Sequence, residues 1–484
     1  MTRLRSLLAW PVVVAVWCSA EPIGLRAQEK LQVVPAVDPA SAQLTLEEVL
    51  GSVQAHHPVL RAEIEAVQAA IGGEQQASGL YDPTLQVKGS IGPAGHYDYN
   101  LLDASIAQLT PLWGAELYGG YRLQGQKLPD YYGELATLDR GELRAGLRIP
   151  LWKDRAIDDA RAARKRAEAG KQAAEWQRNA TLLELYRGAA TAYYDWTAAA
   201  LDRQVQADLL TLAEQRVEQV KWKVQHGALP AIEALDNKRA LLSREAKLID
   251  ATRKLEQAEL KLALYLRDDA GRLRRPSGLS PRSLELPSLP PRFEEAEMIE
   301  QALRSHPLLA RYESEIQAQR VDLELADNGV APDLAVAGEV SKDFGGGEYE
   351  QSLRPAALRL TASLKVPLAL RQARGKRQAA AAKLRALEAK ADYARDKQRL
   401  EALNQASAVR NALERASRTL HMAEVAEQLA EGERSRFELG ATTLIWVTNR
   451  EQTAADARID AIHAIADAQV ALAAYKTTLA QRPL

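Results

Sequence analysis

The residues that most often do chemistry do not gather into a recognisable site in this sequence. Seven histidines are scattered along 484 residues. His57 and His306 each stand directly before a proline at equal positions of an internal repeat, which favours a helix-turn feature over a metal ligand. The run of glycines at 345–347 lacks the lysine of a phosphate-binding loop, so it is expected to be a hairpin loop. We therefore expect no catalytic centre, no metal site and no cofactor, and the sequence predicts a protein that is not an enzyme.

Cys18 is the only cysteine, and it lies in a segment with the features of an export signal. Two arginines precede an apolar stretch at 7–17, and Ala20 or Ala27 offers a small residue for cleavage. We expect residues 1–27 to be a signal peptide that is removed, which leaves an exported chain without a thiol.

The charge balance and composition narrow the class of protein further. The chain has 63 basic and 64 acidic residues, so no strong net field would attract nucleic acid, and no nucleic-acid partner is expected. Abundant alanine together with 26% charged residues favours long helices. Beyond the signal, no apolar run reaches the roughly 20 residues of a spanning helix, so residence in a membrane would have to use strands.

Two halves of the chain repeat one pattern. His57-Pro58 matches His306-Pro307 at a distance of 249 residues, whereas Pro150 matches Pro367 at only 217. The shorter distance predicts an extra hairpin in the first half, near 113–144. We expect a first repeat at 28–275 with about four strands, a proline-rich linker at 276–292 and a second repeat at 293–484 with about two strands.

Alternation of apolar and polar residues predicts strands with two different faces. The alternation is regular at 84–91, 117–124, 142–151 and 357–366, and it is poor at 104–110. The segment 332–338 is the second-half counterpart of 83–89. Strands of about ten residues with this pattern are typical of outer-membrane barrels. Trp113 and Trp152 stand at strand ends, where indoles prefer the lipid–water boundary. Five tyrosines are expected in loops at the opposite end: Tyr97, Tyr99, Tyr131, Tyr132 and Tyr349. The alternative is a soluble antiparallel sheet with one wet face.

The remaining stretches predict helices of matching length. Residues 155–225 contain no proline and would span about 105 Å, and 371–438 would span about 100 Å. A heptad seam runs along the first of them, through Leu182, Tyr186, Ala189, Tyr193, Trp196 and Ala200. Shorter helices are expected at 45–79, 231–267, 293–328 and 442–479. Two short helices placed end to end would equal one long helix in each half, which predicts a wall of uniform height.

Too few strands are present in one chain to close around a pore. Unpaired backbone groups in lipid cost several kcal/mol each. Several chains must therefore share one barrel, and closed symmetry makes a ring the natural arrangement.

The duplicated helix–strand–helix unit and two glycine turns resemble the TolC-like outer-membrane efflux proteins, over nearly the whole chain from Leu44 to Gln481. The most specific element is 436–444, which begins Arg-Phe-Glu-Leu-Gly and resembles the family's turn at the periplasmic tip. The first-half copy, 223–230, matches less closely. The resemblance implies a mainly α fold with membrane β: a long α-helical periplasmic barrel joined to a shared transmembrane β-barrel.

The family resemblance also implies partners and roles. It implies a homotrimer in the lipid of the outer membrane, a periplasmic adaptor protein and an inner-membrane transporter. Lys223, Gly227, Arg436 and Gly440 would contact the adaptor at the tips, or would simply end helices. In the first half, a tip gate would use Glu233. No carboxylate follows the turn in the second half, so there the gate would use Trp446 and Asn449. An extra hairpin in the barrel would give about 18 strands rather than the usual twelve; alternatively it folds over the rim.

Three functions remain open at this point. The first is a channel-tunnel for efflux or export, and it is the one that the strands, helices and resemblance favour. The second is a structural coiled-coil protein of the envelope. The third is a secreted soluble enzyme with a helical arm.

Overall fold

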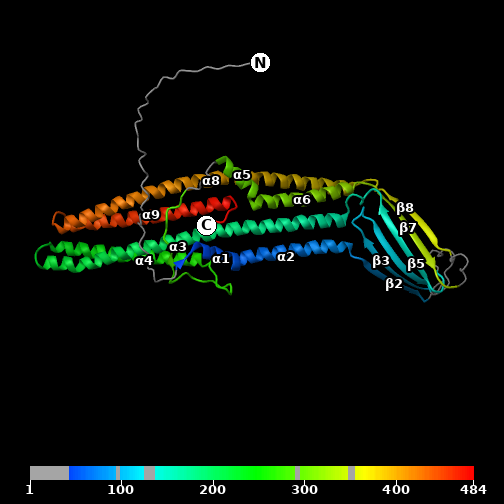
Figure 1. Ribbon diagram of the computed structural model, residues 1–484, viewed down its shortest axis with the longest axis horizontal. Helices are drawn as coiled ribbons and strands as arrows, with labels where there is room; N and C mark the ends of the chain where they lie inside the picture. The colour runs from blue at the N-terminus through cyan, green and yellow to red at the C-terminus, as the bar shows by residue number, and fades with distance from the viewer. Residues whose placement is uncertain (1–42, 94–98, 125–136, 289–294, 347–354, 484) are drawn as a thin grey trace, which may run out of the picture.

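The protein is elongated, with long helices along its length and one curved sheet at the end (Figure 1). The computed structural model describes residues 43–93, 99–124, 137–288, 295–346 and 355–483. Two long helices, α3 (Asp159–Gln225) and α8 (Arg371–Glu438), run the length of the helical part. Their bounds confirm the two long helices expected from the sequence. Asp158 caps α3 by accepting a hydrogen bond from the Arg161 amide at 2.7 Å.

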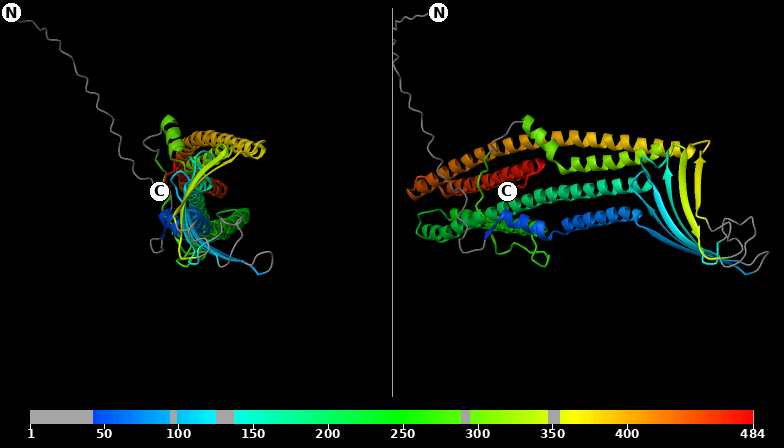
Figure 2. Two further views of the ribbon diagram at one scale, coloured as in Figure 1. Left: turned by 90° about the vertical axis from the view of Figure 1, so that its right-hand side faces the viewer. Right: turned by 45° about the vertical axis from the view of Figure 1, so that its right-hand side comes forward.

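Shorter helices pair along each long helix. α2 (Pro58–Ser78) packs against the sheet end of α3, and α4 (Ala231–Leu262) packs against its far end. α6 (Pro307–Asn328) and α9 (Leu444–Thr478) pack against α8 in the same way. The expected end-to-end stacking is therefore present, and it produces a wall of even height (Figure 2). α3 also contacts α6 and α9, which joins the two halves of the wall.

Two helices that were expected to be continuous are each broken in two. α1 (Leu46–His56) ends just before α2, and α5 (Glu295–Ser305) ends just before α6. Proline cannot continue a helix without losing a backbone hydrogen bond, so the breaks fall at His57-Pro58 and His306-Pro307. His57 and His306, expected to be a helix-turn feature, are the N-cap residues of α2 and α6.

The linker between the repeats contains more structure than expected. Two-residue strands β1 (Gln43–Leu44) and β6 (Ser280–Pro281) pair in parallel. A short 3₁₀ turn, η1 (Gly79–Tyr81), leads from α2 into the large sheet.

Six strands form that sheet in the order β2-β3-β4-β5-β7-β8, and every neighbouring pair is antiparallel. Their bounds are β2 Thr84–Gly92, β3 Tyr99–Leu109, β4 Glu116–Gln124, β5 Glu142–Pro150, β7 Asp333–Asp343 and β8 Ala357–Lys365. In this sheet, β2 to β5 come from the first half of the chain and β7 and β8 from the second. Tyr99 begins β3, so its expected place in a loop was wrong; the other four tyrosines of that group lie outside the described residues.

The extra hairpin is part of the sheet rather than a loop over its rim. Comparison of the repeats matches β2 with β7 and β5 with β8, since β7 pairs directly with β8. The additional strands of the first half are thus β3 and β4, at 99–124, somewhat earlier than the expected 113–144. They pair with each other and with β2 and β5 along their length.

Packing between the helices uses large side chains on α3 and small ones near the far end. Tyr186, Ala189, Tyr193 and Trp196 of the expected seam on α3 are each at most 5% exposed. The contact between α8 and α9 near their far ends is lined almost entirely by alanine, which allows close approach: Ala423, Ala426, Ala430, Ala454, Ala457 and Ala461. Among the described residues, none of the helices is long and apolar enough to cross a membrane.

Candidate functional site: a two-faced sheet and two helix tips

One face of the six-stranded sheet is apolar and uncovered. The alternation places the apolar side chains of neighbouring strands in register, as in the pairs Val87–Ala104, Leu117–Leu147 and Val340–Leu358. Many of them are more than 45% exposed: Leu85, Val87, Ile91, Leu102, Ile106, Leu117, Leu143, Val340, Leu358, Leu360 and Leu364. An uncovered apolar surface of this extent marks contact with lipid or another protein.

The opposite face carries charged residues that neutralise one another. Arg144 Nη2 lies 2.6 Å from Asp103 Oδ1, and Arg122 Nε lies 3.2 Å from Asp103 Oδ2. Arg122 Nη1 lies 3.7 Å from Glu142 Oε2. Three strands contribute to this cluster, so the polar face is ordered by cross-strand ion pairs. An apolar face opposite a polar face is the arrangement of a wall between lipid and water.

Among the described residues, the two margins of the molecule have no neighbouring element on their outer sides. The outermost strands β2 and β8 have no neighbour on one side, and every residue of β8 is exposed. Two helices on these margins carry exposed apolar residues seven apart: α4, which lies in line with α2 on one margin, and α8 on the other. On α4 these are Leu235, Leu242 and Ile249, and on α8 they include Tyr393 and Leu400. A seven-residue spacing of exposed apolar residues is the pattern of a coiled-coil seam that lacks its partner.

The far end of the helical part is formed by two turns with the same geometry, α3 to α4 and α8 to α9 (Figure 1). Gly227 and Gly440 both have φ of 72°. The amide of Ala228 donates to the Lys223 carbonyl at 2.8 Å, and the amide of Ala441 donates to the Arg436 carbonyl at 2.8 Å. This is the Schellman motif, in which glycine supplies the left-handed residue. The sequence therefore identified two equivalent helix ends.

Side chains link the two tips. Lys223 Nζ lies 4.7 Å from the centre of the Phe437 ring, a cation–π contact between the α3 and α8 ends. Arg436 is 61% exposed at its side chain and lies 3.4 Å from Glu433. Both basic residues therefore lie at the tips, where adaptor contact was expected.

The expected gate residues lie just beyond the turns. Glu233 is in the first turn of α4, and its Oε2 is buried with no hydrogen-bond partner within the part of the chain that the structure describes. Trp446 is 57% exposed, and Asn449 is also exposed. Glu233 and Trp446 are at corresponding places in the two hairpins, each in the first turn after the tip, and Asn449 lies one turn beyond Trp446. The role of the three as a gate stays a prediction.

A buried charge cluster near the tips was not found from the sequence. Glu451, two turns into α9, is fully buried and lies 2.6 Å from Arg216 of α3. It also lies 3.0 Å from Arg244 of α4 and 3.1 Å from Arg434 of α8. One carboxylate thus joins all four helices at this level. Its partners are far away along the chain, so no local pattern could have identified them.

The neighbouring arginines keep the Glu451 carboxyl group ionised. Burial by itself raises the pKa of a carboxyl, but the hydrogen bonds and charges of Arg216 and Arg244 outweigh it and lower the pKa of Glu451 to about 2. Burial lowers the pKa of Arg244, which donates its other bond to the Leu209 carbonyl at 3.0 Å. The cluster is therefore charged at neutral pH.

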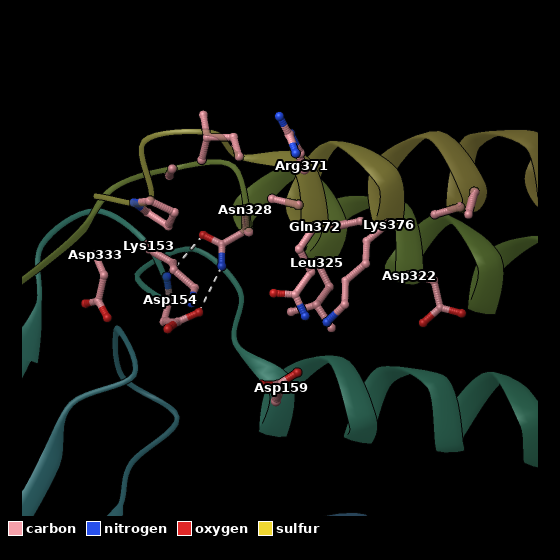
Figure 3. Close-up of a pocket in the computed structure, with 18 of the residues that line it drawn as sticks. Lys153, Asp154, Asp159, Asp322, Leu325, Asn328, Asp333, Arg371, Gln372 and Lys376 are labelled. Carbon is pink, nitrogen blue, oxygen red and sulfur yellow. Dashed lines mark hydrogen bonds between the residues drawn. The ribbon is translucent and has the colours of Figure 1, made fainter. Parts of the chain in front are cut away.

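A cavity of about 770 Å³ lies where the sheet meets the helices (Figure 3). Asp154 and Asn328 close one side, with Asn328 Nδ2 donating to Asp154 Oδ1 at 3.0 Å. Asp333 and Lys365, which belong to the polar face of the sheet, line it as well, so the cavity lies on the polar side. Its acidic and basic residues are mixed, and no group of side chains suited to a metal ion occurs among the described residues.

Comparison with known proteins supports the expected class. Residues 117–266 match the sequence profile of the outer membrane efflux protein family. This match confirms the expected resemblance to outer membrane efflux proteins over those residues. No curated protein is significantly similar to the chain in sequence.

Solved structures share the fold over most of its length. The outer-membrane channel OprN is 16% identical with a TM-score of 0.63, covering 90% of this chain and 89% of that one. The CmeC channel of Campylobacter jejuni is 11% identical with a TM-score of 0.63, covering 90% and 85%. The VceC outer membrane protein of Vibrio cholerae is 16% identical with a TM-score of 0.62, covering 90% and 96%. At these identities the likeness establishes the fold alone.

Proposed function

We propose that this chain, a TolC-like outer membrane efflux protein by its family match and fold, assembles into a ring and serves as a passive conduit for export. The observation that carries the proposal is the pair of unpartnered margins. β2 and the helices beside it form one margin, and β8 with α8 forms the other. Different margins that join head to tail generate a closed ring when the rotation closes.

The strand directions support closure. Six strands alternate in direction across the sheet, so β8 of one chain would meet β2 of the next as another antiparallel pair. Pairing of these edges satisfies the backbone groups that lipid would leave without partners. The exposed heptad residues of α4 and α8 would be covered by the same contact. We propose a homotrimer on the basis of the family resemblance.

The remaining surfaces have places in this assembly. The apolar face of the sheet would meet outer-membrane lipid, and the polar face would line the pore. The tips with Lys223, Gly227, Arg436 and Gly440 would meet a periplasmic adaptor protein that joins the conduit to an inner-membrane transporter. Residues 1–27, which lie outside the described residues, would direct export and be removed.

Single-channel recording tests the conduit. The purified protein in a planar bilayer should give discrete conductance steps and should need detergent to stay in solution before reconstitution. A protein recovered in quantity from the aqueous periplasmic fraction contradicts the proposal. Membrane insertion without conductance under any condition favours the structural coiled-coil protein instead.

The gate and tip residues have separate tests. Replacing Glu233 by Ala should raise conductance if its carboxylate helps to hold the tip closed, and an unchanged value removes it from the gate.

Replacing Lys223 and Arg436 by Ala should reduce cross-linking to the adaptor while the oligomer stays intact. Gln substitution of the exposed Arg418, away from the tips, is the matched control.

A further inference from the structure

The half of α8 nearer the sheet carries a row of lysines at a regular spacing. Lys376, Lys383, Lys390 and Lys397 follow one another every seven residues, and all four are exposed. We call them the lysine row. Seven residues of helix rise about 10 Å, so the row is about 30 Å long, and a seven-residue spacing keeps it on one side of a packed helix. Between 371 and 387, α8 has six basic residues and no acidic one. This end of the helix is therefore strongly positive.

The lysine row lies on one side of the contact between α8 and α6. The buried residues of α8 along this contact follow a heptad: Ala380, Ala391, Ala394 and Gln398. The lysines directly precede one core position of the heptad, as Lys390 precedes Ala391, whereas Arg395 directly follows the other core position, at Ala394. Lys390 and Arg395 therefore lie on opposite sides of the same contact.

The two sides of this contact differ in charge. On the Arg395 side, opposite charges face each other across the helices: Arg395 Nη2 lies 3.8 Å from Glu313 Oε1, and Arg320 Nη2 lies 3.8 Å from Glu388 Oε1. On the other side, none of the four lysines forms an ion pair with a described residue. Mixed signs are typical of a solvated helix face, and the lysine row departs from that pattern.

Acidic residues close enough to neutralise the row are already engaged. On α8, the only one that stands three or four residues from any of the lysines is Glu401, and it lies 3.4 Å from Arg187. α6 has five acidic residues, and each one lies within 3.8 Å of an arginine or of Lys165: Glu313, Glu315, Asp322, Glu324 and Asp327. The row therefore keeps its positive charge within one chain.

The next chain of the proposed ring would not neutralise the row either. The α8 margin would meet the margin of the next chain that contains α2, and α2 has only three acidic residues. Glu63 accepts a hydrogen bond from Thr181 Oγ1 at 3.2 Å, and Glu74 lies 3.1 Å from Lys171 Nζ, so both are held by α3. Only Glu65 would be left to face four lysines.

The row begins in the cavity where the sheet meets the helices. Lys376 and Lys383 line this cavity of about 770 Å³ together with Asp333 and Lys365 of the polar face. Lys376 extends into the cavity from α8 (Figure 3). The lysine row is thus on the same side of the wall as the polar face of the sheet, which would line the pore in the proposed ring.

We propose that the lysine row binds solutes with several negative charges on their way to the membrane strands, so that the cargo of this conduit is polyanionic. The inference rests on the proposed function, because it needs the polar side of the wall to face a pore. A lysine ammonium group acts as a point charge toward carboxylate and phosphate alike, so the row recognises the number of charges rather than one chemical group. A solute whose charges are about 10 Å apart reaches two or more lysines at once, and the second contact then forms within one complex.

Interruption of the single-channel current by a short acidic peptide tests the row. Hexaglutamate extends to about 20 Å, so it can reach three lysines of one chain. Added at the side of the tips in about 0.1 M potassium chloride, it should interrupt the current of the natural chain, and uncharged hexaglutamine should not. The interruptions should shorten at about 1 M salt, where the Debye length falls from about 10 to about 3 Å. The reversal potential is not the readout, because univalent ions in the middle of a wide pore are screened from its wall.

Two sets of substitutions on α8 separate the row from the overall charge of the helix. Lys376→Gln, Lys383→Gln, Lys390→Gln and Lys397→Gln together should shorten the interruptions about tenfold or more, because several individually weak contacts act together. The matched control removes four exposed arginines from the other side of the same helix and should leave the interruptions unchanged: Arg374→Gln, Arg385→Gln, Arg395→Gln and Arg399→Gln. Interruptions that persist in the lysine variant, or that disappear in the arginine variant, overturn the proposal.

The remaining outcomes are also decisive. If the fourfold lysine variant forms no channels, Lys383→Gln with Lys390→Gln replaces it and should shorten the interruptions about threefold. Conductance steps of the natural chain that hexaglutamate never interrupts contradict the lysine row while the proposed function stands. A natural chain that gives no conductance contradicts the proposed function, and this inference fails with it.

Discussion

Glu451 shows how one residue can join parts of the chain that the sequence keeps apart. Its carboxylate has three arginine partners, from α3, α4 and α8, and none of the four side chains can be removed without leaving a charge near the interior. Breaking a buried ion pair by removing one partner costs about 3 to 5 kcal/mol, since the remaining charge stays desolvated. The cluster is thus a place where the loss of one charge should have a large effect on stability.

Glu451→Gln is expected to destabilise the tip region by about 3 kcal/mol at pH 7, because Arg244 would stay buried without a carboxylate. The matched control is Glu427→Gln, since Glu427 is exposed and pairs only with Arg434 at 3.3 Å among the described residues. Exposed pairs contribute about 1 kcal/mol or less. Thermal unfolding of the detergent-solubilised protein, followed by helical circular dichroism, compares the two. Equal effects of the two substitutions would show that the cluster does not stabilise the fold.

The same carboxylate predicts a pH dependence. Its pKa is lowered from 4.5 to about 2 in the folded protein, so the folded state binds the proton less well than the unfolded chain does. The stabilisation is therefore complete above about pH 4.5 and is lost as the pH falls toward 2. The stability difference between the natural chain and Glu451→Gln should be constant from pH 7 to 5 and should shrink below pH 4. A difference that already shrinks between pH 7 and 5 contradicts this assignment.

Replacing glycine by alanine should change the free energy of unfolding in opposite directions at the tips and inside a helix. Gly227→Ala and Gly440→Ala should each destabilise their turn by about 1 kcal/mol, because both residues have φ of 72°. Gly375→Ala, inside α8 and with open space around a new Cβ, should stabilise by about 0.5 to 1 kcal/mol. Hydrogen exchange of the Ala228 and Ala441 amides should accelerate only in the tip variants. No acceleration there would mean that the turns do not need glycine.

At the residue scale, the sequence predicted features that adjacent residues determine and missed features that depend on distant residues. Gly227 and Gly440 were predicted to end helices because a helix end is determined by a few adjacent residues. Glu451 was not found because Arg216 and Arg244 are 235 and 207 residues away along the chain. An isolated glutamate in a helix predicts a solvated side chain, and only the packing of four helices reverses that expectation.

Among the elements, strands with one apolar face were predicted well and β3 was predicted poorly. Its apolar side carries Asn100 and Gln108, and its polar side carries Leu101 and Leu109, so the alternation is weak. β3 is nevertheless an inner strand of eleven residues with a partner on both sides. Pairing with β2 and β4 fixes it where its own side chains do not. The breaks at His57 and His306 were missed although Pro58 and Pro307 lie well inside the expected helices, because a proline inside a helical pattern can kink one helix as well as separate two.

The faces of β8 provide a test with adjacent residues. Leu360 is 74% exposed on the apolar face, and Thr361 is exposed on the polar face. Both are near the middle of the strand. Leu360→Arg should destabilise folding into lipid vesicles by about 2 to 4 kcal/mol, because a charge would face the hydrocarbon, and Thr361→Arg should cost about 1 kcal/mol or less. Denaturant titration of vesicle-bound protein measures both. The opposite order would mean that the polar face, not the apolar face, meets lipid.

For the whole molecule, the balance of charge along the proposed pore determines its ion preference. The polar face of the described strands has as many basic as acidic residues: Lys88, Arg122, Arg144, Arg148, Arg359 and Lys365 against Asp103, Glu116, Glu142, Asp333, Glu339 and Asp343. A ring of one sign of charge is what makes a wide pore selective for ions of the other sign. Mixed charges at short range cancel beyond the Debye length of about 8 Å at physiological salt. We therefore expect little selectivity from these strands.

A reversal potential measured across a potassium chloride gradient tests this expectation. The natural chain should reverse close to zero. Arg359→Gln removes one positive charge per chain and Arg359→Glu replaces it with a negative one, so the reversal potential should move toward cation preference in two steps of similar size. Because a ring repeats each substitution in every chain, the shift adds around the pore. Strong selectivity in the natural chain, or no shift with Arg359→Glu, would mean that ions pass a narrower place elsewhere and that this face does not set the preference.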